Sequence, residues 1–462
     1  MPETNRKIIF ACASIVLAVC LCGALLSILG AAALIITDSE TFESFSDPDT
    51  EVWAEEYTQA DYPGISEAIF DQMKKIEKAI ISIRGLSPTG GIDRLLYTPE
   101  QLRGRVNDEF FGDYTEEDAA SDALVLWTFG LIERDADLLQ IYIDLYSEAV
   151  TGFYDDSTGE MVVVYNSKFG GMESLTYAHE YIHVLQDQNY DLNGALGYNE
   201  ETCQQDTERC AALQALIEGD ATHAEITWFE NYATQTEIHQ IEEAYDNYDY
   251  TAFDASPAFL QEDLMFPYMY GQLFVEFLFN LGGWKRVDSA YSNPPVSTEQ
   301  ILHPERYPED EPVVVQLPDM SAVFDEDWVL LDEGVMGEWY TYLILAYGYD
   351  PQGRLEESDA AVAAEGWGGD AYAVYFNEHT EETVMVMSYV WDTGDDYEQY
   401  LKAFYQYATQ RFGHVTLTSG GHSAWSDASG YTSLYFQGNT TAWIFATNQQ
   451  LADQVGQAFE VP

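Results

Sequence analysis

Two histidines with a glutamate between them form the part of the sequence best suited to chemistry. Residues 175–187 contain His179, Glu180 and His183, which follow the pattern His-Glu-x-x-His. Residues four positions apart lie on one face of a helix, so both imidazoles could bind the same metal ion. Glu180 would lie about 100° round the helix, near a water molecule carried by that ion. A pair of ordinary core histidines is the alternative interpretation, but the pattern favours a metal site.

A helix must carry this motif, and a second helix must complete the site. The apolar positions that would bury the first helix are Leu175, Ala178, Ile182 and Leu185. Catalytic zinc sites use three protein ligands, so one more is needed. The residues after His183 supply neither the Gly nor the third His of the pattern HExxHxxGxxH, which excludes a metzincin. Further on, Leu213, Ile217 and Ala221 predict a second apolar helix face, and Glu218 interrupts it with a carboxylate that needs a partner.

These two stretches together carry a resemblance to a known family. His179-Glu180-x-x-His183 followed by Leu216-x-Glu218-Gly219-x-Ala221 resembles the gluzincin zinc metallopeptidases, whose third ligand is a glutamate on the next helix. More narrowly, the chain is similar to a little-studied group of membrane-anchored prokaryotic members. The phrases that carry this similarity are Gly152–Asp155, His183–Gln188, Glu218–Ala221, Ser297–Pro304 and Gly366–Asp370.

The resemblance implies a zincin-like fold, Zn²⁺ as cofactor and hydrolysis of a protein or peptide substrate. It implies that His179, His183 and Glu218 bind the ion. Glu180 would then act as general base towards the bound water. Asp220 is a candidate for orienting a ligand. A non-catalytic cell-surface binding or adhesion module on the same fold is the alternative function.

Two residues are candidates for stabilising the oxyanion of the reaction. Gluzincins use a Tyr or His from beyond the third ligand, and some members carry the Tyr in a YxKG-like phrase that opens an apolar helix. Tyr268-Met-Tyr-Gly271 keeps the Tyr and the Gly at that spacing, with Tyr270 in place of the Lys. His303, just before a helix-stopping Pro304, is the alternative.

Composition indicates a globular, strongly acidic protein. The 462 residues are 47% hydrophobic, and 80 Asp and Glu stand against 18 Lys and Arg, for a net charge of -62. Nucleic acid and anionic membrane surfaces would be repelled. We interpret the charge as adaptation to high salt, because molar salt reduces the Debye length to about 3 Å and screens the self-repulsion.

The N-terminus contains a long apolar segment. No charged residue occurs from Ile8 to Ile36, and about 20 apolar residues suffice to cross a bilayer. Arg6 and Lys7 precede the segment, which predicts a cytoplasmic N-terminus and an extracellular catalytic domain. Cleavage near Ala31–Ala33 or lipidation at Cys20 are the alternatives. We therefore expect a single-pass anchor in the cell membrane.

The remaining pattern predicts an α+β protein of several segments. These are the cytoplasmic N-terminus and transmembrane anchor 1–36, an acidic tether 37–61, a mainly helical zincin-like catalytic domain 62–329 with a small β-region, and a C-terminal α+β domain 330–462. Helices are expected up to about residue 148, one over 66–84 and another capped by Thr98 and opened by Pro99. Residues 152–159 predict a turn that leads into a strand over 160–165. The resemblance implies that 162–165 edges the substrate cleft, and an ordinary buried strand is the alternative.

The sequence also predicts the secondary structure of the C-terminal domain and a role for the two cysteines outside the apolar segment. Strands are expected near 372–376, 384–391, 431–436 and 442–446, and helices near 396–408 and 449–459. Cys203 and Cys210 predict a disulfide in an oxidising compartment, with zinc ligation as the competing use. The sequence leaves the oligomeric state open.

Overall fold

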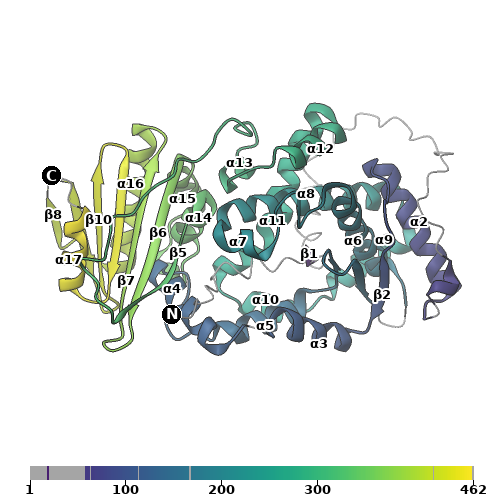
Figure 1. The fold of residues 1–462 in the computed structure, drawn as a ribbon, viewed down its shortest axis with the longest axis horizontal. Helices are drawn as coiled ribbons and strands as arrows, with labels where there is room; N and C mark the ends of the chain where they lie inside the picture. Colours follow the sequence, from purple (N-terminus) through teal and green to yellow (C-terminus); the bar gives the residue numbers. More distant parts are fainter. Residues whose placement is uncertain are drawn as a thin grey trace.

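The computed structural model describes Ala18–Val19 and residues 58–459, apart from positions 63, 113, 166, 167 and 420. Figure 1 shows a mainly helical part beside a C-terminal part built on a large sheet. The α+β class expected from the sequence is confirmed. The helical part carries the residues of the candidate metal site.

Side chains cap the N-termini of most helices in the first part. The helices are α2 (Glu67–Arg84), α3 (Pro99–Phe110), α4 (Glu116–Phe129), α5 (Leu138–Ala149), α6 (Gly171–Tyr190), α7 (Glu200–Gln205), α8 (Thr207–Asn231), α9 (Gln235–Asp246), α10 (Thr251–Ala255), α11 (Ala258–Gly282), α12 (Trp284–Ser292) and α13 (Thr298–Leu302), preceded by the 3-10 turn η2 (Gln59–Asp61). Ser66 accepts a hydrogen bond from the Ile69 amide, and Thr98 forms a capping box with Gln101. Both predicted helix starts are therefore confirmed.

A small sheet packs against α6. Its strands are β1 (Ala18–Val19), β3 (Gly152–Asp155), β4 (Glu160–Val164) and β2 (Asp93–Tyr97), in that order across the sheet. β3 and β4 form an antiparallel hairpin, whereas β2 runs parallel to β4. The strand over 160–165 is confirmed, but the backbone of β4 is already paired with β2 and β3, which favours the interpretation as an ordinary buried strand. The expected turn over 152–159 begins with a strand, and β2 was not predicted.

The predicted transmembrane helix requires a correction. In the described part of the chain, no helix is long and apolar enough to cross a membrane. The predicted span, residues 8–36, lies outside the described residues except for Ala18–Val19, which form a strand. Ala18 pairs with Tyr154 of β3, so the backbone of this strand bonds to a neighbouring strand and not within a helical turn. The tether predicted for 37–61 also lies outside the described residues, except for its last four positions.

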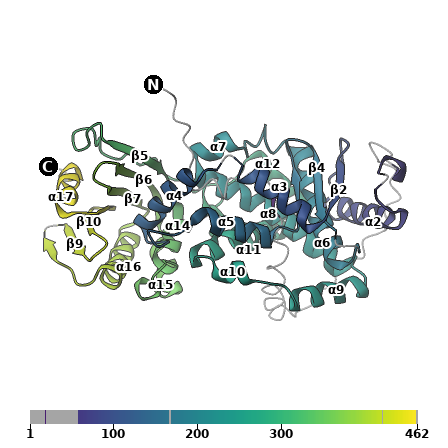
Figure 2. The ribbon, with the colours of Figure 1, turned by 90° about the horizontal axis from the view of Figure 1, so that it is seen from below.

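The C-terminal part is a seven-stranded antiparallel sheet. Its strands are β5 (Trp328–Gly334), β6 (Trp367–Asn377), β7 (Glu382–Trp391), β8 (Leu417–Ser419), β9 (His422–Ser426), β10 (Tyr431–Gln437) and β11 (Thr440–Ala446), in the order β5-β6-β7-β11-β10-β9-β8. Its helices are α14 (Gly337–Ala346), α15 (Glu357–Ala364), α16 (Gly394–Phe412) and α17 (Gln449–Phe459), with the 3-10 turn η3 (Pro351–Gly353). Figure 2 shows α17 on one face of the sheet and α16 on the other. All four predicted strands and both predicted helices are confirmed.

The two parts share one hydrophobic core. Phe129, the last residue of α4, packs edge to face against Tyr372 of β6 and Trp443 of β11. Arg411 of α16 donates hydrogen bonds to the carbonyls that end α4, including that of Phe129 at 2.8 Å. The predicted domain boundary at 329/330 falls inside β5, and the core runs across it.

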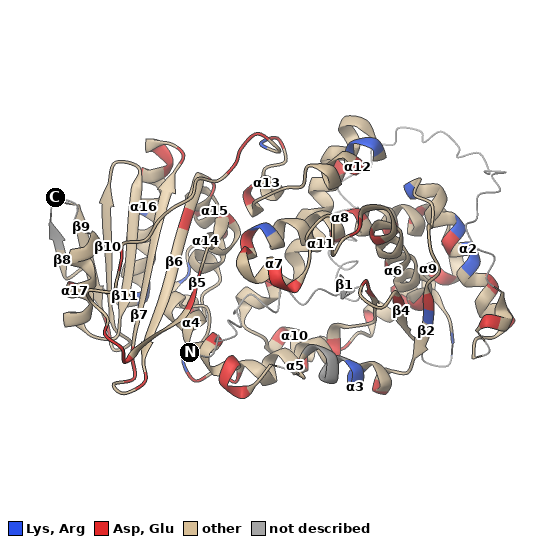
Figure 3. Cartoon of the chain, viewed as in Figure 1, with Lys and Arg blue, Asp and Glu red and all other residues tan. Residues whose placement is uncertain are grey.

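Acidic side chains are spread over both parts, as Figure 3 shows. Several of the few cations are instead buried in ion pairs, including Arg84 with Asp220 and Arg94 with Glu77. Other carboxylates, among them Glu208 and Asp370, are buried without a cation in an ion pair, so buried acids outnumber buried cations in the described residues.

Candidate metal centre

Helices α6 and α8 bring together the three side chains that the sequence suggests as metal ligands. His179 and His183 lie on one face of α6, with ring centroids 4.8 Å apart. Glu218 approaches from α8, where its Oε2 lies 3.2 Å from His179 Nε2 and 3.4 Å from His183 Nε2. All three side chains are buried, and one donor atom from each lies within 4.8 Å of the others.

Glycines explain how α8 and α11 come close enough to place these groups. A Cβ on Gly219, the residue after Glu218, would lie 2.1 Å from the carbonyl oxygen of Gly271. A Cβ on Gly271 would in turn lie 2.1 Å from the Ala215 carbonyl oxygen. Any larger residue would force the two helices apart. The glycines of the two sequence phrases therefore set the contact that fixes Glu218 opposite α6.

A second carboxylate fixes the orientation of His179. Glu225, seven residues after Glu218 and so on the same face of α8, lies with Oε2 2.6 Å from His179 Nδ1. An ionised carboxylate only accepts hydrogen bonds, so Nδ1 carries the proton and Nε2 presents its lone pair towards Glu218. Sequence reasoning missed Glu225. The signal that could have found it is its spacing of two helical turns from Glu218.

His183 is oriented by its own helix. Gln186 donates from Nε2 to the Ile217 carbonyl at 2.9 Å, which leaves its Oε1 to accept from His183 Nδ1 at 2.8 Å. The proton of His183 is thereby assigned to Nδ1. Its Nε2 is buried and makes no hydrogen bond, although Glu218 lies near it.

The donor set fits a bound cation. When each ring carries one proton, on Nδ1, two imidazole lone pairs and one carboxylate oxygen converge. When the rings are protonated on both nitrogens instead, burial still raises the pKa of Glu218, but the positive rings, His183 first, outweigh it and lower that pKa to about 2. The carboxylate is therefore ionised. Two histidines and one glutamate are a ligand set used by catalytic zinc sites.

Glu180 lies beside the ligands, under strand β3. Its carboxylate is fully buried. A Cβ on Gly152 of β3 would lie 3.5 Å from Glu180 Cγ and only 2.6 Å from the methyl group of Thr176. Only glycine at position 152 allows the strand to pack this closely on the helix, so the Gly152–Asp155 phrase positions the sheet against the proposed base.

Of the other predicted site residues, Tyr268 lies near the metal centre, whereas Asp220 and His303 have partners of their own. Tyr268 of α11 is buried, and its ring centroid lies 6.3 Å from that of His179. Asp220 contacts Arg84 at 2.7 Å and accepts from Tyr291 at 2.7 Å, so Glu225 and not Asp220 orients a ligand. His303 lies 2.8 Å from Glu338 in a cluster between α13 and α14.

That cluster contains a second set of carboxylates, Glu299, Asp310 and Asp392, whose oxygens lie within 4.8 Å of one another. Arg306 pairs with Glu299 and lies 3.9 Å from Asp392. The guanidinium already supplies the positive charge, so we interpret this group as an ion-pair cluster between the two parts of the chain.

The cysteine prediction is confirmed, since Cys203 and Cys210 form a disulfide that ties α7 to the first turn of α8.

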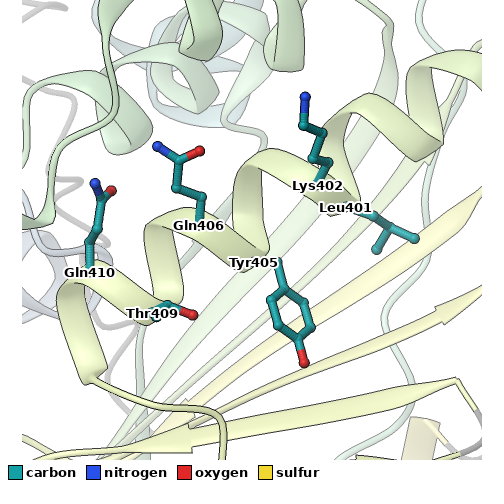
Figure 4. A pocket seen from close by; sticks show the side chains of 6 residues that line it. All are labelled: Leu401, Lys402, Tyr405, Gln406, Thr409 and Gln410. Carbon is teal, nitrogen blue, oxygen red and sulfur yellow. The ribbon is translucent and has the colours of Figure 1, made fainter.

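A surface hollow of about 610 Å³ lies away from the candidate metal centre, over α16 of the C-terminal part. Its lining residues are Leu401, Lys402, Tyr405, Gln406, Thr409 and Gln410 (Figure 4). These six side chains include no carboxylate or histidine, so the hollow is not a rival catalytic site.

Comparison with known proteins covers only the C-terminal part. A family model described as a domain of unknown function (DUF8575) matches residues 329–456. No curated protein and no solved structure matches the chain. The matched range begins in β5 and spans the seven-stranded sheet, whereas the candidate metal centre lies before it in the sequence.

Proposed function

We propose that this protein is a zinc-dependent metallopeptidase of the gluzincin type. The observation that carries the proposal is the convergence of His179, His183 and Glu218, whose donor atoms lie within 4.8 Å of one another, with the buried Glu180 on the same helix as the histidines. These three residues would hold Zn²⁺. A bound zinc ion would polarise the scissile carbonyl and lower the pKa of a water molecule to about 7.

The chain's own residues have defined tasks in this proposal. Glu180 accepts the proton of the attacking water and passes it to the leaving amine. Glu225 and Gln186 hold the two imidazoles in the tautomers that present Nε2. Tyr268 donates its hydroxyl proton in a hydrogen bond to the developing oxyanion, a role supported by its position next to His179.

The disulfide supports a location in an oxidising compartment, outside the cytoplasm. The charge of -62 supports work at high salt and argues against nucleic acid as a partner. A purely adhesive module would have no use for Glu180, since a structural metal site needs no general base.

The test is hydrolysis of a mixed peptide library by purified protein with measured zinc content. We expect about one zinc per chain, cleavage by the wild type and loss of cleavage in Glu180→Gln with zinc retained, because the amide cannot accept the proton. Glu230→Gln, an exposed position on α8, is the matched control and should cleave normally. Equal rates for Glu180→Gln and the wild type would refute the proposed mechanism.

A further inference from the structure

A buried arginine ends helix α2 and pairs with the residue two positions after Glu218. The side chains of Arg84 and of its partner Asp220 are both 0% exposed. Removing two charges from water costs free energy that their attraction offsets only when the geometry is good, so a buried ion pair is weak evidence for stability alone. The place of this pair in the fold is therefore the feature that needs an explanation.

The guanidinium of Arg84 joins three helices that meet near the metal centre. Its Nε and Nη2 donate to the two oxygens of Asp220 on α8, at 2.7 and 3.0 Å. Nη2 also donates to the hydroxyl of Tyr190, the last residue of α6, at 3.1 Å. Nη1 donates to Asp288 of α12 at 2.6 Å. One rigid, planar group thus binds the helix of Glu218 and the helix of both histidines at the same time.

The partners of Arg84 are also bound to one another. The Tyr190 hydroxyl donates to Asp288 at 2.7 Å, and the hydroxyl of Tyr291 on α12 donates to Asp220 at 2.7 Å. The rings of Tyr190 and Tyr291 stack, with their centroids 3.9 Å apart. These contacts fix the end of α6 and the whole of α12 against the side of α8 that carries Asp220.

This network holds α8 on the side away from the metal ligands. A helix turns about 100° per residue, so Asp220 and Glu218 project about 200° apart. The Glu218 carboxylate faces the two histidines, while Asp220 faces the guanidinium. A side-chain oxygen lies about 6 Å from its helix axis, so a rotation of α8 by about 10° would move the Glu218 carboxylate by about 1 Å. A displacement of that size can cost on the order of 100-fold in rate.

We propose that Arg84 is a positioning residue for the metal centre, and that its bond to Asp220 sets the rotation of α8 at which Glu218 meets the two histidines. This inference rests on the proposed function for its metal ion and adds a residue from a distant helix. Asp220 acts through the backbone of α8, whereas Glu225 orients His179 directly. An ion pair that only stabilised the fold would change the melting temperature and leave the metal centre as it is.

The experiment removes both charges at once, in Arg84→Met combined with Asp220→Asn. Loss of one partner would leave a buried charge unpaired, whereas loss of both avoids that cost. Zinc affinity is measured by competition with a chromophoric chelator, and the visible spectrum of the Co²⁺-substituted protein reports the arrangement of the ligands. We expect the zinc-free double variant to melt close to the wild type, to bind zinc about 10-fold or more weakly and to have an altered Co²⁺ spectrum.

The control removes another buried ion pair, that of Arg94 on β2 with Glu77 on α2, in Arg94→Met combined with Glu77→Gln. It should keep the zinc affinity and the Co²⁺ spectrum of the wild type. Arg84→Lys keeps the charge but not the planar fork, so its zinc affinity should stay below that of the wild type.

A folded double variant with the zinc affinity and Co²⁺ spectrum of the wild type would overturn the inference, and so would an equal loss of affinity in the control. Neither measurement needs catalysis. A wild type that binds zinc and cleaves nothing would therefore contradict the peptidase proposal alone, while the variants still decide the role of Arg84.

Discussion

The carboxylate of Glu225 should contribute measurably to metal affinity although it does not bind the metal. Its Oε2 lies 2.6 Å from His179 Nδ1, and the two side chains are only 10% and 1% exposed. Hydrogen bonds to an ionised group are roughly twice as strong as neutral ones, and loss of such an outer carboxylate typically lowers metal affinity by about 10- to 100-fold.

Two substitutions separate the charge from the hydrogen bond. Glu225→Gln can still accept from Nδ1 through its amide oxygen, so we expect a loss of zinc affinity of about 10-fold. Glu225→Ala leaves a buried N–H without a partner, which costs about 1–3 kcal/mol, so we expect a loss nearer 100-fold. The larger loss in the alanine variant would show that the bond, and not only the charge, holds the ring.

The assay is competition for zinc between the protein and a chromophoric chelator at fixed pH and salt. Glu230→Gln on the same helix is the control for loss of one negative charge, and it should bind zinc like the wild type. Thermal unfolding of the zinc-free proteins checks that the variants are folded. Zinc affinities within two-fold of the wild type for both Glu225 variants would refute the assignment of Glu225 as the group that orients His179.

Three further predictions follow from the same geometry. Glu218→Ala should lose stoichiometric zinc while its far-ultraviolet circular dichroism stays that of a folded protein; full zinc occupancy would move the third ligand elsewhere. Tyr268→Phe should bind zinc normally and lose about 100-fold or more in kcat, whereas Tyr270→Phe on the same helix should keep its turnover, and comparable rates for the two would assign Tyr268 to the core. Burial raises the pKa of Asp370 to about 7, so its contribution to stability is present in acid and is lost as pH rises through that value. The melting temperature of Asp370→Asn should therefore fall less than that of the wild type between about pH 5 and pH 8, and parallel curves would contradict this.

Helix α6 was predictable because the residue spacing that indicates it lies within one short stretch of sequence. The spacing of His179 and His183 defines one helix face, and the apolar positions at 175, 178, 182 and 185 predict that the helix is buried, as α6 is. Glu218 could be suggested because it interrupts an apolar face and matches a family phrase. Its approach to α6 depends on the contact between Gly219 and Gly271, which joins two distant stretches and cannot be read from either one.

Non-local pairing explains what sequence reasoning assigned incorrectly. Asp220 lies two residues after Glu218, but its partner Arg84 is 136 residues away in the sequence. Glu225 resembles an ordinary surface glutamate until His179 is placed beside it. Residues 152–155, with a Gly and an Asp, are typical of a turn, and they form a strand because β4 pairs with them and α6 leaves no room for a Cβ at Gly152.

Strands β6, β7, β10 and β11 were predictable because long runs of Val, Tyr, Phe and Trp favour strands whatever their partners, whereas β5, β8 and β9 were not predicted. Their order in the sheet was not, since β7 pairs with β11 across an intervening helix and three strands. The apolar count from Ile8 to Ile36 likewise measures hydrophobicity and not conformation, and the two residues of that segment that the structure describes are in a strand.

Anomalous diffraction at the zinc absorption edge, from crystals of the purified protein, tests the central claim most directly. We expect one strong peak about 2.0–2.2 Å from His179 Nε2, His183 Nε2 and a Glu218 oxygen, with room for water at the fourth position. A zinc-loaded crystal without a peak there, or with its peak among Glu299, Asp310 and Asp392, would contradict the assignment of this site as the metal centre.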